Sequence, residues 1–226
     1  MHSISKFWIM NNNKLPAFER LLLFSFLFTF GILFYRCIFS GSFHYTFLLW
    51  NLFLAATPYF VSKQLAKCKD LSFKAVLLLT SWLLLFPNSP YILTDIFHFS
   101  PKDNIPFWYD SLLFFSAAWT GLLPGLVSLG KVEAFLSNHL QKFWIKASIF
   151  FCLLLSGYGV YLGRFLRFDS WDVITDPKRL LAVSERNIFN PEQHLRLWVF
   201  VILFAISMDL LYVGFKNLPT ALKRTH

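Results

Sequence analysis

Residues 21–34 read LLLFSFLFTFGILF, a run with no charged side chain and no alternation between apolar and polar positions. The missing alternation argues against a strand of a membrane β-barrel, whose residues face lipid and lumen in turn. The apolar sequence continues toward the length of about 20 residues that a helix needs to cross a bilayer. Basic residues precede this run and no small-x-small cleavage pattern follows it, so we interpret it as a retained signal anchor.

The composition extends this interpretation to the whole chain. Of the 226 residues, 56% are hydrophobic, 20% aromatic and only 15% charged, whereas globular proteins carry about 25% charged residues. In lipid, only helices and closed barrels satisfy every backbone group. We therefore predict an all-α, polytopic transmembrane bundle that forms a single integral-membrane domain over residues 1–226. It has about six spans, at residues 18–39, 44–62, 73–93, 108–130, 144–165 and 195–215.

The net charge of +9 follows from this topology. Thirteen basic and three acidic residues fall on the side of the two termini, and eight of each fall on the other side. Lys and Arg accumulate in cytoplasmic loops, so we expect both termini in the cytoplasm and the acid-rich loops outside. The expected partner is the lipid bilayer, and the positive charge gives no reason to expect nucleic acid.

The third span ends in PNSPYILTDIFH (residues 87–98). Pro87 and Pro90 remove two backbone donors, so we expect the helix to break there. Beyond the break, Asp95 and His98 are spaced i, i+3, which suits proton transfer or a shared metal ion. Asn88, between the prolines, is a candidate ligand-binding residue. The alternative is a loop in which Asp95 caps a turn and His98 lies among lipid headgroups.

The fourth span begins with FWYDSLLFF at residues 107–115. Tyr109 fits an aromatic belt at the headgroup level and is a candidate ligand contact. Asp110 lies directly before the apolar run. It either favours the positive end of the helix dipole or faces the bundle as a titratable group.

The fifth span closes with LGRFLRFDSWD at residues 162–172. Arg164 and Arg167 are spaced i, i+3 and suit binding of a phosphate or carboxylate, with Trp171 and Asp172 as further candidate contacts. The alternative is an interfacial network in which these arginines are neutralised by the acids that follow them. The outer loop 166–194 contains a possible interfacial helix at residues 177–189, which Asp176 and Pro177 would begin.

Small residues recur along the fifth span and predict close helix packing. They are Ser148, Cys152, Ser156, Gly159 and Gly163. The three cysteines of the chain show no disulfide or zinc spacing. Two segments, WNLFLAATPYF (50–60) and WLLLFPNSPYI (82–92), share a Trp and a Pro-Tyr pair at equal offsets. This similarity is compatible with an inverted repeat of the kind found in transporters, or with coincidence.

The predicted topology brings the three polar segments to the same outer interface. The catalytic candidates are Asp95, His98 and Asp110, and the first two are also the first candidates for a metal site. The ligand-binding candidates are Arg164, Arg167, Tyr109, Trp171, Asp172 and Asn88. The sequence identifies no cofactor and leaves the oligomeric state open.

Three classes of function remain open. The first is binding, transfer or hydrolysis of an anionic or lipid-linked substrate at the outer polar site. The second is a small transporter or permease component, which would need polar residues toward both faces, and the sequence offers only Asn51 and Asp209 in the cytoplasmic halves of the spans. The third is a structural or assembly subunit, whose motifs fix the bundle.

Taken together, the segments PNSPYILTDIFH, WYD and LGRFLRFDSWD resemble the signature segments of a bacterial integral-membrane family catalogued as domain-of-unknown-function family 1361. The resemblance extends over most of the chain, from the second span to the last. The family has Ala where this chain has Ser89 and Asn where it has Asp169, so the resemblance favours Asp172 over Asp169 as a functional acid. It implies a bacterial inner-membrane location and no established activity.

Overall fold

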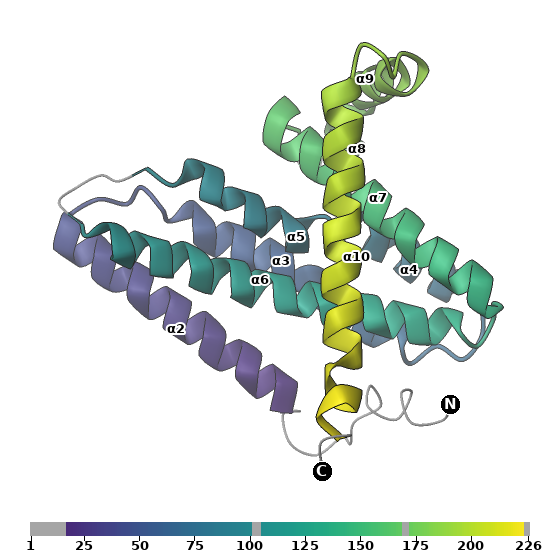
Figure 1. Cartoon of the computed structure of the whole chain (residues 1–226), viewed down its shortest axis with the longest axis horizontal. Coiled ribbons are helices and arrows are strands. Elements are labelled where there is room, and N and C mark those ends of the chain that lie inside the picture. Colours follow the sequence, from purple (N-terminus) through teal and green to yellow (C-terminus); the bar gives the residue numbers. More distant parts are fainter. Residues whose placement is uncertain (1–16, 101–104, 169–171, 224–226) are drawn as a thin grey trace.

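A computed structural model of the chain describes residues 17–100, 105–168 and 172–223, and within these ranges it contains helices and no strands. The all-α prediction is therefore confirmed. In chain order the elements are α2 (Ala17–Ser40), α3 (Phe47–Leu65), α4 (Phe73–Leu85), α5 (Asn88–Tyr91), the 3-10 helix η1 (Ile92–His98), α6 (Phe107–Leu136), α7 (Lys142–Leu166), α8 (Asp172–Thr175), α9 (Pro177–Phe189) and α10 (Leu195–Lys223) (Figure 1).

Five segments in the described part of the chain are long and apolar enough to cross a membrane, so the protein is a multi-pass membrane protein. They are Ala17–Ser40, Phe73–His98, Phe107–Leu136, Lys142–Leu166 and Leu195–Asn217. The sixth predicted span corresponds to α3, which has 19 residues but includes Asn51, Lys63 and Gln64 and is not among the five. Phe18 and Phe215 pack against the same apolar cluster, so α2 begins near the place where α10 approaches its end (Figure 1).

Helix α6 is the centre of the bundle. Eighteen of its 30 residues are buried, and it packs against both α2 and α3. Its glycines permit close approach to the third span. A Cβ atom on Gly125 would lie 2.5 Å from the Cβ of Ser89, and one on Gly121 would lie 2.9 Å from the side chain of Ile92. These contacts fix the broken segment of the third span against the core.

Helix α7 packs on α10 with one face and on the third span with another. A Cβ atom on Gly157 would lie 3.1 Å from the carbonyl oxygen of Val201, which belongs to α10. A Cβ atom on Gly159 would lie 3.0 Å from Pro87, and one on Gly163 would lie 2.9 Å from the Tyr91 ring. The predicted packing role of the small residues in this helix is confirmed for Gly159 and Gly163.

The predicted break in the third span is confirmed, and it takes the form of a change in helix type. Helix α4 begins after Ser72, whose hydroxyl accepts a hydrogen bond from the amide of Ala75, and it ends at Leu85. Phe86 and Pro87 keep right-handed helical dihedral angles, and the chain then continues through α5 into η1. The polar residues after the prolines therefore lie on a tight helix and not on an extended loop.

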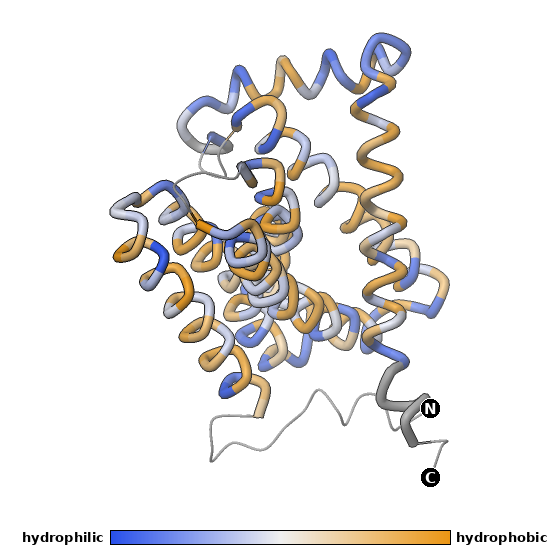
Figure 2. The backbone as a smooth tube through the Cα atoms, turned by 60° about the vertical axis from the view of Figure 1, so that its left-hand side comes forward, coloured by the Kyte–Doolittle hydropathy of each residue, from blue (hydrophilic) through white to orange (hydrophobic). Residues whose placement is uncertain are grey.

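Helix α9 spans the residues that the cap pattern predicts. The Asp176 side chain accepts a hydrogen bond from the amide of Arg179, and Pro177 occupies the first turn. Leu181, Ile188 and Phe189 are exposed, as expected for a helix that presents an apolar face to lipid. Figure 2 shows that α10 is hydrophobic along most of its length, whereas hydrophobic and hydrophilic residues alternate closely along α9.

Two similar polar clusters connect helices at the end of the bundle that lies away from α9. Each consists of a glutamate from one helix and a Tyr-x-x-x-Lys pair from another. Glu19 accepts hydrogen bonds from Tyr59 and, at 2.5 Å, from Lys63. Glu133 accepts hydrogen bonds from Tyr212 and, at 2.6 Å, from Lys216. These clusters connect α2 with α3 and α6 with α10.

Candidate functional site

A buried ion pair joins the broken third span to α7. Arg164 Nη2 donates to Asp95 Oδ1 at 2.5 Å, and Arg164 Nε donates to the Thr94 hydroxyl at 2.9 Å. Asn51 Nδ2 donates to the other carboxylate oxygen at 2.8 Å, and the guanidinium carbon lies 4.4 Å from the centre of the Tyr91 ring. The side chains of Arg164 and Asp95 are only 6% and 1% exposed. Both oxygens of Asp95 are therefore engaged, and the pair is neutral.

This arrangement places two predicted site residues together, as partners of each other. Asp95 is a predicted acid–base residue and Arg164 is a predicted anion-binding residue. In the structure the charge of each is compensated by the other. Asn51, which the sequence analysis assigns to the cytoplasmic half of its span, instead lies against Asp95. The pair thus connects α3, η1 and α7.

His98 lies in a different environment from Asp95. The 3-10 repeat places residues i and i+3 on the same side of η1, yet Asp95 is buried and His98 is exposed at the end of the element. The His98 ring packs edge-on against Phe47, with 5.5 Å between the ring centres. Among the described residues, no group of three or more His, Cys, Asp or Glu side chains gathers in a way that would hold a metal ion.

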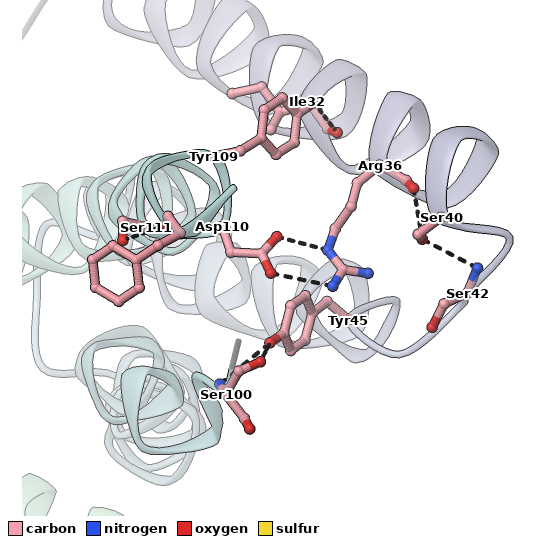
Figure 3. A network of polar contacts seen from close by, with 10 residues as sticks. Ile32, Arg36, Ser40, Ser42, Tyr45, Ser100, Tyr109, Asp110 and Ser111 are labelled. Carbon is pink, nitrogen blue, oxygen red and sulfur yellow. Dashed lines mark hydrogen bonds and ion pairs between the residues drawn. The ribbon is translucent and has the colours of Figure 1, made fainter. Parts of the chain in front are cut away.

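A second buried ion pair involves Asp110. Arg36 Nε donates to Asp110 Oδ1 at 2.7 Å, and Arg36 Nη2 donates to Oδ2 at 3.2 Å (Figure 3). The Arg36 side chain is 0% exposed, and its guanidinium lies 4.2 Å from the centre of the Tyr45 ring. The hydroxyl of Tyr109 donates to the carbonyl oxygen of Ile32 at 2.8 Å. Tyr109 and Asp110 therefore fasten the start of α6 to α2.

The sequence analysis gave Arg36 no role at the site. An arginine near the end of an apolar span needs a carboxylate partner, and this requirement is the signal that could have pointed to Arg36. The two ion pairs use different elements, α2 and α6 in one case and α3, η1 and α7 in the other. The acids and bases that the predicted topology collects in one site thus form two separate ion pairs.

The other predicted site residues that the structure describes are Arg167, Asp172 and Asn88. Arg167 ends this helix in the left-handed conformation, with φ 57° and ψ 42°, and it is exposed, whereas Arg164 one turn earlier is nearly covered. Asp172 begins α8 and accepts a hydrogen bond from the Thr175 hydroxyl at 3.1 Å. Asn88 donates to the carbonyl oxygen of Leu85 at 2.9 Å. Trp171 and Asp169 lie outside the described residues.

A cavity of about 360 Å³ lies between α3, the third span, α7 and α9. Its volume is within the range of about 300–1,000 Å³ that is typical of ligand sites. Most of its wall is apolar and includes Leu54, Leu83, Leu84, Pro87, Leu155, Leu162, Phe168 and Leu180. Its polar wall residues are Asn51, Asn88, Tyr91, Tyr158 and Ser184, and Trp50, Gly159 and Gly163 complete the lining.

The Asp95–Arg164 pair lies directly behind this wall. Asn51 lines the cavity and donates to Asp95, and Tyr91 lines the cavity and packs under Arg164. Glycine at position 163 leaves room for the Tyr91 ring, because a Cβ atom there would lie 2.9 Å from it. The ion pair therefore holds two wall residues of the cavity in place.

Helix α9 is tied over one side of the cavity. The Tyr158 hydroxyl donates to Ser184 Oγ at 3.0 Å and accepts from Asn187 Nδ2 at 3.3 Å. Arg179 lies 4.8 Å from the centre of the Phe168 ring, measured from its guanidinium carbon. The sequence analysis did not single out Tyr158 or Ser184. A serine among Leu180, Val183 and Asn187 on the inner face of an amphipathic helix is the signal that was available.

The comparison with known proteins adds a family and no activity. No curated protein and no solved structure shows significant similarity to the chain. A family model matches residues 50–211, a region that includes Asp95, Asp110, Arg164 and the cavity wall. The chain therefore belongs to the family described as "Protein of unknown function (DUF1361)".

Proposed function

We propose that this protein binds an amphiphilic, lipid-linked ligand that enters the cavity from the bilayer. The observation that carries the proposal is the lateral opening of a cavity with a mixed wall. Trp50 and Leu84 both line the cavity, yet they are 52% and 51% exposed on the surface of a membrane protein. An apolar chain can therefore pass from lipid into the cavity without crossing water.

The distribution of the wall residues suggests how such a ligand lies. Leu54, Leu83 and Leu155 line the end that is farther from α9 along their helices, whereas Ser184 lies on α9 itself. Leu155 and Gly163 are eight residues apart on α7, which corresponds to about 12 Å along the helix axis. An alkyl chain would lie along α7, with its headgroup beneath α9.

The geometry favours binding over proton transfer by Asp95. Each carboxylate oxygen of Asp95 has a hydrogen-bond donor, and the neighbouring charge is opposite in sign. Removing one partner of such a buried pair would leave an uncompensated charge. The pair therefore serves to fix Asn51 and Tyr91 in the cavity wall, and the ligand is held by the wall.

Binding can be tested with the purified protein in lipid nanodiscs and a dodecanol probe that carries a photoreactive diazirine in its chain. Leu180→Phe places extra volume in the cavity, whereas Leu181→Phe makes the same change at the next residue, which is 68% exposed. We expect the first variant to reduce labelling of the α7 peptide several-fold and the second to leave it unchanged. Equal labelling of α7 in both variants and the unchanged protein would refute the proposal.

We further propose that the protein resides in the inner membrane with α9 on the extracytoplasmic face and both termini in the cytoplasm. The support is the excess of Lys and Arg over acidic residues in the segments on the side of the two termini. In a variant with Cys37, Cys68 and Cys152 replaced by Ser, Lys178→Cys should react with a membrane-impermeant maleimide in intact cells. Lys67→Cys should react only after permeabilisation, and the reverse pattern would overturn this orientation.

A further inference from the structure

The polar part of the cavity wall is chemically uniform. Among the described residues that line the cavity there is no Asp, Glu, Lys, Arg or His. The polar side chains that line it carry the amides of Asn51 and Asn88 and the hydroxyls of Tyr91, Tyr158 and Ser184. These groups include both donors and acceptors and carry no net charge.

Behind this wall, two described residues of opposite charge, Arg164 and Asp95, are paired with each other. Arg164 is held by Asp95 and Thr94, and Asp95 also accepts from Asn51. An anionic headgroup that displaced the Asp95 carboxylate from Arg164 would leave that carboxylate buried without its counter-ion. A cationic headgroup would displace Arg164 in the same way. A charged headgroup in the cavity would therefore lose its hydration without gaining a free counter-ion from the described residues that line the cavity.

A hydroxyl-bearing headgroup meets better partners. Asp95 accepts one N–H of the Asn51 amide, and that amide carries a second N–H and a carbonyl oxygen. The Ser184 hydroxyl accepts from Tyr158 and has its own proton to donate. The rings of Trp50, Tyr91 and Tyr158 also line the cavity, and their flat apolar faces can pack against the C–H faces of a ring that bears hydroxyls at its edge.

From these observations we infer that the headgroup held in the cavity is uncharged and rich in hydroxyls, so that the ligand is a lipid-linked sugar. This inference rests on the proposed function and names its ligand class. Any charged group of the ligand then remains outside the cavity, on the side where Arg179 packs on Phe168.

The inference is tested by competition against the photoreactive dodecanol probe in nanodiscs. Three competitors share a dodecyl chain and differ in headgroup, namely dodecyl glucoside, dodecyl phosphate and dodecyltrimethylammonium. We expect the glucoside to halve the labelling of α7 at a concentration about ten-fold or more below that of either charged competitor, a difference of about 1.4 kcal/mol.

The possible failures are distinguishable. If dodecyl phosphate or the ammonium compound competes as well as the glucoside, the ligand class is wrong and the amphiphile site remains. If no competitor reduces labelling of α7 and Leu180→Phe has no effect either, both the proposed function and the ligand class are wrong.

A variant of the headgroup region gives a second test. Ser184→Ala removes a wall hydroxyl, and a hydrogen bond that contributes about 1 kcal/mol corresponds to about five-fold in affinity. We expect the half-competing concentration of the glucoside to rise about five-fold and that of dodecyl phosphate to stay the same. Ser207→Ala on α10 is the matched control, because its hydroxyl donates to the carbonyl oxygen of Leu203 and the side chain is exposed. Equal effects on both competitors would contradict a role in sugar binding.

Discussion

The chain contains two buried Arg–Asp pairs with nearly the same chemistry and different surroundings. Arg36 and Asp110 form a two-point contact under the ring of Tyr45, and neither lines the cavity described above (Figure 3). Asp95 and Arg164 are also buried, yet Asn51 and Tyr91 connect them to a cavity. The first pair fastens two helices, and the second holds the wall of a site. Both pairs are buried and consist of the same residue types. They differ because residues that contact the second pair line a cavity.

The largest loss of stability is expected from Arg36→Leu. It leaves the Asp110 carboxylate buried without its partner, and breaking a buried pair in this way costs about 3–5 kcal/mol. The measurement is reversible unfolding in mixed detergent–SDS micelles, followed by circular dichroism.

The double variant Arg36→Leu with Asp110→Leu is the control for this prediction. It removes both charges, so most of the loss should be recovered, while labelling by the photoreactive dodecanol probe should match that of the unchanged protein once folded. A double variant as unstable as the single one would show that the two side chains act independently.

Asp95→Ala should cost somewhat less stability, about 3 kcal/mol, because Arg164 keeps its contacts with Thr94 and Tyr91. Unlike the change at Arg36, it should also lower photolabelling of α7, since Asn51 loses the acceptor that orients it. Both quantities are measured on the same preparation. Reduced stability with full labelling would place this pair in the same purely structural class as Arg36–Asp110.

Gly163→Ala should have a smaller effect that is confined to the second pair. The new methyl group would lie 2.9 Å from the Tyr91 ring on which Arg164 packs, and inserting volume into a packed site costs about 1–3 kcal/mol. Gly31→Ala is the control, because nothing lies within 4 Å of a Cβ atom at that position. Gly163→Ala should lower both the stability and the labelling of α7, whereas Gly31→Ala should lower neither. Equal destabilisation would argue that helix propensity, not the Tyr91 contact, matters.

The smallest effect is expected at the Glu19–Lys63 pair, where the Lys63 side chain is 41% exposed. Exposed ion pairs contribute about 0–1 kcal/mol and are screened by salt. Lys63→Ala should therefore change stability by less than about 1 kcal/mol, and the difference should shrink further when the unfolding assay is repeated at high salt. If Lys63→Ala lowered stability as much as Arg36→Leu does, burial would not explain the difference between the two pairs.

Several elements were predictable from local sequence because their causes are local. Pro87 and Pro90 lack the amide protons that a continuous helix needs, and the third span breaks there. Asp176 and Pro177 supply a cap and a first turn, and α9 spans the predicted residues 177–189. The glycines of α7 predict close packing, which occurs at Gly159 and Gly163.

The candidate site was predictable only in part. Asp95, Asp110 and Arg164 stand out because charged groups in or beside apolar spans need partners. Their partners could not be assigned, since Arg36 and Asp110 are 74 residues apart and several acids lay on the same predicted side. The two partners meet because of the tilt and rotation of α2 and α6, which side-chain packing along both helices determines.

The sequence by itself therefore determined that this is an all-helical, multi-pass membrane protein, where its third span breaks and which charged residues need an explanation. These features follow from hydropathy, proline geometry and capping, which act over a few residues. Only the tertiary structure decided that Asp95 pairs with Arg164, that Asp110 pairs with Arg36, and that the cavity described above lies beside the Asp95–Arg164 pair. Those outcomes depend on how closely the helices approach one another. Residues far apart in the sequence, such as Gly163 and Tyr91, set that distance together.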